Sequence, residues 1–259
     1  MGKAILQDGL SRRTGPLMDS QFLPAFNPRP RIQPIRIGPD DHAYVIDDVL
    51  LNPERMVELA QLNRHQFKRP PVFAYPGLEL GMPADFSSRL DEFFRQHIRG
   101  LLGGRRTLRM SCRLSMVSFT PQELAPRQWS CHRDLDDAIP GECIAASVLY
   151  LFKDSQLGGT SFYLPKRSPA ETNQLVRDAV AMEGPEFTRR YAVAQGYMVD
   201  SNEYFERTCT LPAQWNRMVF YNGAMFHSGA ITAPQSLNDD PQTGRLTLNG
   251  FFASSSKAT

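Results

Sequence analysis

Hydrophobic residues recur at helical spacing in two segments of the first half of the chain. The segment 52–67 begins with Asn52 and Pro53, residues favoured at a helix cap and in the first turn, and its apolar positions form one stripe. The segment 84–102 places aromatic and aliphatic residues at the same spacing and ends at Gly103-Gly104. The pattern predicts two amphipathic helices, each with one face suited to packing on a sheet.

From residue 105 the pattern changes to short runs that alternate or are rich in β-branched and aromatic residues. Turn residues such as Gly158-Gly159 and Asn222-Gly223 separate most of these runs. We expect strands at 43–50, 107–119, 143–152, 160–164, 207–211, 217–221 and 245–252. Many short strands after a helical pair predict an α+β, mainly β fold, a barrel or two-sheet sandwich with the helices packed on one sheet.

One segment interrupts the predicted strands. Ser168 and Glu171 have the spacing of a helix capping box, and Pro169 follows the cap. The pattern predicts one helix over 168–184, inside an insertion that spans 165–206.

The composition narrows the class of protein. The chain has 259 residues, 41% of them hydrophobic, and a net charge of +2, which argues against a dedicated nucleic-acid-binding protein. No apolar run suits a membrane span or a signal peptide, and the spacing of the four cysteines matches no zinc pattern. We therefore expect a cytoplasmic protein with reduced thiols that binds neither nucleic acid nor membranes.

The first 38 residues differ from the rest in charge and proline content. Basic residues outnumber acidic ones there, and the prolines are Pro16, Pro24, Pro28, Pro30 and Pro34. We interpret residues 1–38 as an extended basic arm. A single domain, 39–259, would follow it, with a strand-rich core over 105–254.

The stretch SCHRDLDD at 130–137 contains a candidate metal site. Residues i and i+2 of a strand project from the same face, so His132 and Asp134 would present two ligands together. His227, after an apolar run and an Asn-Gly turn, would supply the third. Two histidines and one carboxylate form the facial triad of non-haem Fe(II) oxygenases. A charged loop without a metal is the alternative, and Asp136 and Asp137 are expected to be solvated acids.

Arg245 and Thr247 lie two residues apart on a predicted apolar strand. A guanidinium that faces a core needs an anion beside it, and arginine binds carboxylates through two parallel hydrogen bonds. The Thr247 hydroxyl could add another donor. A dicarboxylate such as 2-oxoglutarate fits, with its keto acid on iron and its far carboxylate on Arg245. A solvent-exposed arginine on an edge strand is the alternative.

Taken in order, these residues resemble the Fe(II)/2-oxoglutarate-dependent dioxygenases, in particular the prolyl-hydroxylase-like branch. The resemblance covers about residues 105–254 and is carried by CHRD (131–134), LYLFKD (149–154), GGTSFY (158–163), NRMVFYNGAMFHSG (216–229) and GRLTLNGFF (244–252). It implies a double-stranded β-helix, or jelly roll. It also implies that His132, Asp134 and His227 bind iron. Arg245 would bind the far carboxylate of 2-oxoglutarate, with Thr247 and Tyr150 supporting it.

The resemblance implies an oxygenase that uses Fe(II), 2-oxoglutarate and O2 to hydroxylate an unactivated C–H bond. Related halogenases lack the carboxylate ligand, so Asp134 favours hydroxylation over halogenation. The substrate would be an amino acid, a peptide or protein side chain, or a small natural product. A non-catalytic jelly-roll ligand-binding protein and another metal enzyme of cupin type are the alternatives. The oligomeric state is not indicated.

Overall fold

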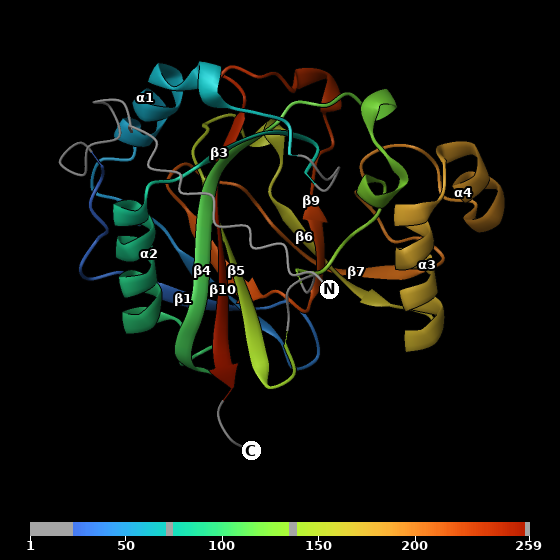
Figure 1. Cartoon of the computed structure of the whole chain (residues 1–259), viewed down its shortest axis with the longest axis horizontal. Helices are drawn as coiled ribbons and strands as arrows, with labels where there is room; N and C mark the ends of the chain where they lie inside the picture. Colours follow the sequence, from blue (N-terminus) through green and yellow to red (C-terminus); the bar gives the residue numbers. More distant parts are fainter. Residues whose placement is uncertain (1–22, 71–74, 135–138, 257–259) are drawn as a thin grey trace, which may run out of the picture.

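The computed structural model describes residues 23–70, 75–134 and 139–256. Within them the chain forms two antiparallel sheets and four α-helices, so the mainly β prediction is confirmed (Figure 1). The larger sheet has the strand order β1-β2-β8-β5-β10-β4-β3, and the smaller has the order β7-β6-β9. The strands are β1 (Ile32–Arg36), β2 (His42–Ile46), β3 (Gly77–Gly81), β4 (Gly104–Val117), β5 (Glu142–Tyr150), β6 (Thr160–Pro165), β7 (Phe205–Leu211), β8 (Met218–Asn222), β9 (Phe226–Gly229) and β10 (Arg245–Ser256).

Two N-terminal helices cover the outer face of the larger sheet. They are α1 (Glu54–Leu62) and α2 (Ala84–His97), and α2 runs alongside β4 (Figure 1). Their apolar stripes meet alternate residues of β10. The rings of Phe94 and Phe252, for example, stack with centroids 4.0 Å apart. The predicted packing of the helices on one sheet is confirmed, although α1 is shorter than the periodic segment and ends before a 3-10 turn.

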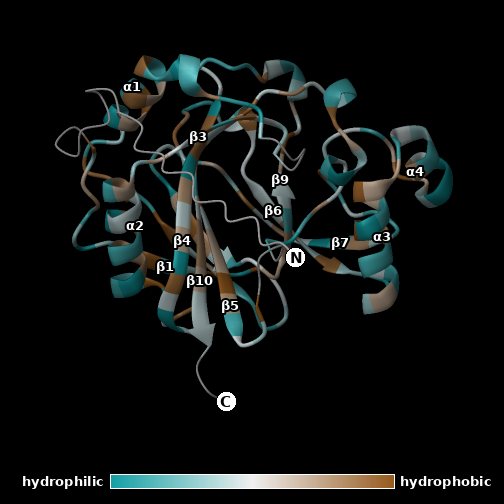
Figure 2. Ribbon diagram, in the orientation of Figure 1, coloured by the Kyte–Doolittle hydropathy of each residue, from teal (hydrophilic) through white to brown (hydrophobic). Residues whose placement is uncertain are grey.

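A second core fills the space between the two sheets. It joins Val148 and Tyr150 of β5 with Phe162 of β6 and Val219 and Tyr221 of β8. Figure 2 shows hydrophobic colour along much of β5, whereas β4 alternates between hydrophobic and hydrophilic segments. The middle strands β5, β8 and β10 are therefore largely buried on both faces, with the helices on one side and the smaller sheet on the other.

The insertion forms two helices, where one was predicted. In α3 (Pro169–Ala181), the Ser168 hydroxyl accepts from the Glu171 amide at 3.3 Å, as the capping-box spacing indicates. The backbone turns extended at Met182, and α4 (Gly184–Tyr191) starts again with a proline in its first turn. The helix predicted over 168–184 is confirmed as α3. Helix α4, which begins at the Gly184-Pro185 pair where the predicted helix ends, was missed. Both helices lie beside the smaller sheet, on the side opposite α1 and α2 (Figure 1).

The described part of the predicted arm belongs to the folded domain. Residues 32–36 form β1, which pairs with β2 at the edge of the larger sheet, and Leu23 and Ile37 are buried. The arm prediction was wrong there because an edge strand tolerates proline, as at Pro34, whose missing N–H can face away from its neighbour. The remainder of the arm, residues 1–22, lies outside the described residues, as do Asp136 and Asp137. None of the described helices is long and apolar enough to cross a membrane.

Candidate metal centre

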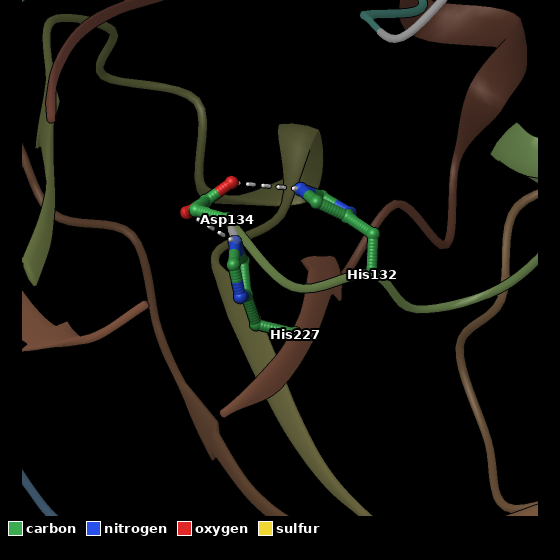
Figure 3. A group of neighbouring side chains, drawn as sticks. All are labelled: His132, Asp134 and His227. Atoms are coloured by element: carbon green, nitrogen blue, oxygen red, sulfur yellow. Dashed lines mark ion pairs between the residues drawn. The ribbon is translucent and has the colours of Figure 1, made fainter. Parts of the chain in front are cut away.

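Backbone pairing brings the predicted triad together from distant parts of the sequence. His132 and His227 of β9 exchange two backbone hydrogen bonds of 2.9 Å, which is an antiparallel bridge. The Asp134 amide donates to the carbonyl oxygen of Gly223 at 2.8 Å, in the turn that precedes β9. Figure 3 shows the three side chains converging, with the Asp134 carboxylate facing both imidazole rings.

The donor atoms of the triad are spaced as metal ligands would be. One atom from each residue lies within 4.8 Å of the others. Nε2 of His227 is 3.4 Å from Oδ2 of Asp134, and Nε2 of His132 is 3.7 Å from Oδ1. Donors at metal–ligand distances of about 2.1 Å would be separated by roughly 3 Å in adjacent coordination positions. Oδ2 of Asp134 is buried without a hydrogen-bond partner among the described residues. A cation between the three donors would satisfy it, so the residues fit a metal ion.

The ring of His227 is held in one orientation. Its Nδ1 is 2.9 Å from the carbonyl oxygen of Met225, and a carbonyl can only accept a hydrogen bond. Nδ1 therefore carries the proton, and the lone pair of Nε2 faces Asp134. The buried ring also packs edge-on against Tyr221, with centroids 4.7 Å apart.

His132 borders an open cavity. Its side chain is 57% exposed toward that cavity. Desolvation within the protein, followed by the nearby His227, lowers the pKa of His132 to about 4, against the opposing effect of Asp134. The ring is therefore neutral at neutral pH, which is the form that binds a metal.

The Asn222-Gly223 turn needs its glycine for close packing. A Cβ at residue 223 would lie 3.0 Å from Cγ2 of Ile144 and 3.3 Å from Cβ of Asp134. The turn also donates its Gly223 amide to the carbonyl oxygen of Ile144 at 2.8 Å. The glycine thus lets one turn join β5 to the loop that carries Asp134.

One cavity of about 360 Å³ connects the triad with Arg245 and Thr247. On β10 the side chains alternate, so Arg245, Thr247 and Asn249 line the cavity while Leu246 and Leu248 pack in the helix-covered core. The residues that sequence analysis paired with a 2-oxoglutarate carboxylate and those paired with a metal therefore face the same space.

Arg245 is a buried cation without a carboxylate beside it in the described part of the chain. It is 4% exposed, and its Nε and Nη2 donate to the carbonyl oxygens of Leu157 and Gly159, each at 2.9 Å. No ion pair of Arg245 is found among the described residues, and Nη1 has no hydrogen-bond partner there. Because an unpaired buried charge is strongly unfavourable, this end of the cavity is suited to an anion.

Gly158 makes this arrangement possible. Its φ is +80°, and a Cβ there would lie 2.0 Å from the carbonyl oxygen of Ala230. The Gly158-Gly159 loop can therefore place its carbonyl oxygens within hydrogen-bond distance of Arg245. These hydrogen bonds fix the plane of the guanidinium.

The sequence profile of a family described as "Family of unknown function (DUF6445)" matches residues 28–252. The chain belongs to DUF6445. The match includes the triad and Arg245. No curated protein matches the chain.

Solved structures with distant likeness to this DUF6445 protein include two kinds of enzyme. One is the non-heme alpha ketoglutarate dependent epimerase SnoN from nogalamycin biosynthesis, at 16% identity over 82% of this chain and 77% of that chain, with a TM-score of 0.39. Another is an N-substituted L-amino acid dioxygenase from Burkholderia ambifaria AMMD, at 11% identity over 87% of this chain and 97% of that chain, with a TM-score of 0.38.

Tyr75 is a cavity residue of this DUF6445 protein that sequence analysis missed. Its hydroxyl is buried and makes no hydrogen bond of ordinary length with a described residue, although the Thr247 hydroxyl and the Arg245 guanidinium are close enough to act on it. Burial is the main cause that raises the pKa of Tyr75 to about 12, so the hydroxyl stays a proton donor. No motif surrounds Tyr75 in the sequence. It reaches the cavity because β3, which it precedes, pairs with β4.

Thr247 and Tyr150 are placed differently from each other. Thr247 lines the cavity and donates to the carbonyl oxygen of Ser115 at 3.3 Å. Tyr150 lies behind the cavity wall, and its hydroxyl is 2.8 Å from Oγ1 of Thr160, which lines the cavity. Any effect of Tyr150 on a bound carboxylate would therefore pass through Thr160.

Proposed function

We propose that this DUF6445 protein is an Fe(II)- and 2-oxoglutarate-dependent oxygenase that hydroxylates an unactivated C–H bond. The observation that carries the proposal is the single cavity with a His-Asp-His triad on its wall and a buried guanidinium, without a carboxylate partner in the described chain, at its end. A metal alone would explain the triad, and an anion alone would explain Arg245. A keto acid with a second carboxylate explains both.

In this proposal His132, Asp134 and His227 hold Fe(II) and leave its other coordination positions open. The bound metal would supply the activation of O2 by which 2-oxoglutarate becomes succinate and CO2 while one oxygen atom enters the substrate C–H bond. The retained carboxylate of Asp134 supports hydroxylation over halogenation.

The protein's own groups would bind and orient the co-substrate. Nη1 of Arg245 and the hydroxyl of Tyr75 are free to donate to the far carboxylate, and Thr247 could turn its hydroxyl from Ser115 toward it. The carbonyls of the 157–159 loop keep the guanidinium in position without neutralising its charge. The hydrogen bond to Met225 holds His227 in the tautomer that presents Nε2.

The order of strands supports a jelly roll in this proposal. The sequence β4-β10-β5-β8 forms the middle of the larger sheet, and the His132 bridge extends the smaller one to 132-β9-β6-β7. From β4 to β10 successive segments alternate between the two sheets except for β6 and β7, which are neighbours in the smaller sheet, an order that fits a double-stranded β-helix. The triad then lies on the smaller sheet and Arg245 on the larger.

An anaerobic titration tests the proposed function. Wild-type protein loaded with Fe(II) is titrated with 2-oxoglutarate while the visible iron-to-ketoacid charge-transfer band is recorded. We expect a saturable band that is lost in His132→Ala and that requires far more 2-oxoglutarate in Arg245→Ala. Folded, iron-loaded wild type without a band would contradict the proposal. It would favour a ligand-binding protein or a metal enzyme that does not use 2-oxoglutarate.

A further inference from the structure

The lining of the cavity is positively charged outside the proposed 2-oxoglutarate site as well. Three more arginines, Arg113, Arg127 and Arg133, line it, and Asp134 is the only acidic residue among the described residues that do so. If Asp134 binds the metal, no described carboxylate on the wall balances these cations. The remaining ligand of the cavity should therefore carry negative charge.

Two of these arginines are already engaged by protein groups. Nε of Arg113 is 2.9 Å from a carboxylate oxygen of Glu79, and its guanidinium lies 4.5 Å from the Phe251 ring centroid. Arg133 donates to Asn173 at 2.9 Å and covers the ring of Phe226. Both have fixed positions and reduced capacity for a ligand.

The third arginine sits in a short turn with a second unused donor. Arg127 and Gln128 belong to the 3-10 helix η5 (Pro126–Gln128), and both line the cavity. Arg127 has no hydrogen bond or ion pair with a described residue, and its charge acts on the neighbouring His132 ring. Oε1 of Gln128 accepts from the Ala125 amide at 2.9 Å, so the orientation of its amide group is set. Its Nε2 is buried without a partner in the described chain.

The wall next to this turn is aliphatic. Helix α3 packs against η5 and presents Leu175, Val176, Ala179 and Val180 to the cavity, a stripe at helical spacing. Val180 is 61% exposed and Val176 36%, although both are apolar. A ligand that binds η5 would cover part of this surface.

We propose that the hydroxylated substrate is a small carboxylic acid with an aliphatic body, whose carboxylate binds Arg127 and Gln128 and whose aliphatic part lies against α3. This inference rests on the proposed function, because it assigns the substrate of the same site. A cavity of about 360 Å³ is at the small end of ligand sites, which supports a small molecule over a protein surface. The insertion would then form part of the substrate site.

Matched ligands test the charge of the substrate. Hexanoate, hexanamide and hexylamine are titrated by calorimetry into anaerobic Fe(II)-loaded protein saturated with 2-oxoglutarate, so that the co-substrate site is filled. We expect hexanoate to bind on the order of 10-fold or more tightly than either neutral or cationic analogue. Equal binding of the three, or a preference for hexylamine, would overturn the proposal.

Substitutions test the location of the carboxylate and of the aliphatic chain. Arg127→Gln should weaken hexanoate binding on the order of 10- to 100-fold, the loss typical of one charge-assisted hydrogen bond, while hexanamide binding changes little. Arg95→Gln, on the exposed face of α2, is the matched control and should not change it. Val180→Asp should weaken octanoate more than butanoate, because each buried methylene contributes about fourfold. Unchanged hexanoate binding in Arg127→Gln would overturn the assignment to η5.

The two proposals fail separately in this design. The charge-transfer band reports the iron and 2-oxoglutarate, whereas calorimetry reports the carboxylic acid. A normal band without a preference for the acid overturns the substrate class and leaves the oxygenase intact. Acid binding that depends on Arg127 without any band overturns the oxygenase but supports the carboxylate site.

Discussion

The two faces of β10 differ in role, although their residues alternate along one strand. One face packs in the core and the other lines the cavity. On the outer face Leu246, Leu248 and Phe252 are buried among apolar side chains beneath α1 and α2. On the inner face Arg245, Thr247 and Asn249 line a cavity, and Arg245 is buried without a carboxylate partner in the described chain. Apolar burial on the outer face stabilises the fold, while the inner face keeps a charged group in place that only a ligand would satisfy.

This difference explains how β10 can keep a buried cation that has no carboxylate partner in the described chain. The cation at Arg245 is tolerable because the same strand pairs on both sides, with β5 and β4, and packs its other face against two helices. The stability gained on one face offsets the unsatisfied group on the other. Substitutions on the two faces should therefore separate stability from binding.

The largest effect on stability should come from the outer face. Phe252→Ala removes a ring that is 1% exposed and stacked on Phe94, so we expect a loss of about 3–5 kcal/mol in the free energy of unfolding by urea. Phe251→Ala, one residue away on the half-buried inner face, is the matched control and should lose much less. Equal losses would contradict the comparison of the two faces.

The next largest effect on stability concerns the triad, and we expect it only when a metal ion is bound. A divalent ion at 100 times its dissociation constant should stabilise the wild type by about 2.7 kcal/mol, and Asp134→Asn should lose most of this gain. Metal-free Asp134→Asn should be close to the wild type in stability, because Oδ2 has no hydrogen bond to lose in the described chain. Thermal unfolding with and without Mn²⁺ measures both. As a control, Asp47→Asn breaks the ion pair with Arg217 and should reduce stability while keeping the metal effect.

A smaller effect, on 2-oxoglutarate affinity, is expected when the positive charge at residue 245 is kept but the planar guanidinium is replaced. Arg245→Lys retains the charge and loses the planar fork, so 2-oxoglutarate affinity should fall about tenfold. Iron binding in the absence of 2-oxoglutarate should not change. Titration of the charge-transfer band measures the affinity, with Arg95→Lys as a control. Wild-type affinity in Arg245→Lys would show that the fork geometry is unimportant.

The smallest effect is expected at Tyr75. Tyr75→Phe should weaken 2-oxoglutarate binding about fivefold, the contribution of one hydrogen bond of about 1 kcal/mol. Stability should stay the same or rise, because the buried hydroxyl makes no hydrogen bond of ordinary length with a described residue. Tyr204→Phe gives the opposite control, since that hydroxyl donates to the carbonyl oxygen of Tyr191 at 3.0 Å and the residue is not part of the cavity lining. It should lose stability and keep co-substrate affinity.

Sequence analysis went furthest where chemistry and local spacing coincide. His132 and Asp134 are two residues apart, and Arg245 and Thr247 alternate with apolar residues on one strand, so a period of two was enough to group each pair. The two N-terminal helices were predictable because their apolar stripe repeats over several turns. What these residues bind remains a prediction.

Tertiary contacts explain what sequence analysis missed. Tyr75 reaches Arg245 only through the pairing of β3 with β4. The side-chain amide of Gln128 is oriented only because the Ala125 amide fixes its oxygen. The residues of β1 were predicted to belong to an extended arm because residues 1–38 are rich in proline, yet an edge position accommodates Pro34. No local periodicity encodes these contacts.

The position of β10 has a consequence for how the chain folds. β10 is the last described strand in chain order but lies in the interior of the larger sheet, between β5 and β4. During synthesis these two strands emerge first and lack their shared neighbour, so both present open edges until residues 245–256 arrive. Folding should therefore be slow, as for other sheets closed by distant pairings. Since Arg245 is on this strand, the proposed co-substrate site would form only when the sheet is complete, and chaperone depletion or faster translation should lower the yield of folded protein.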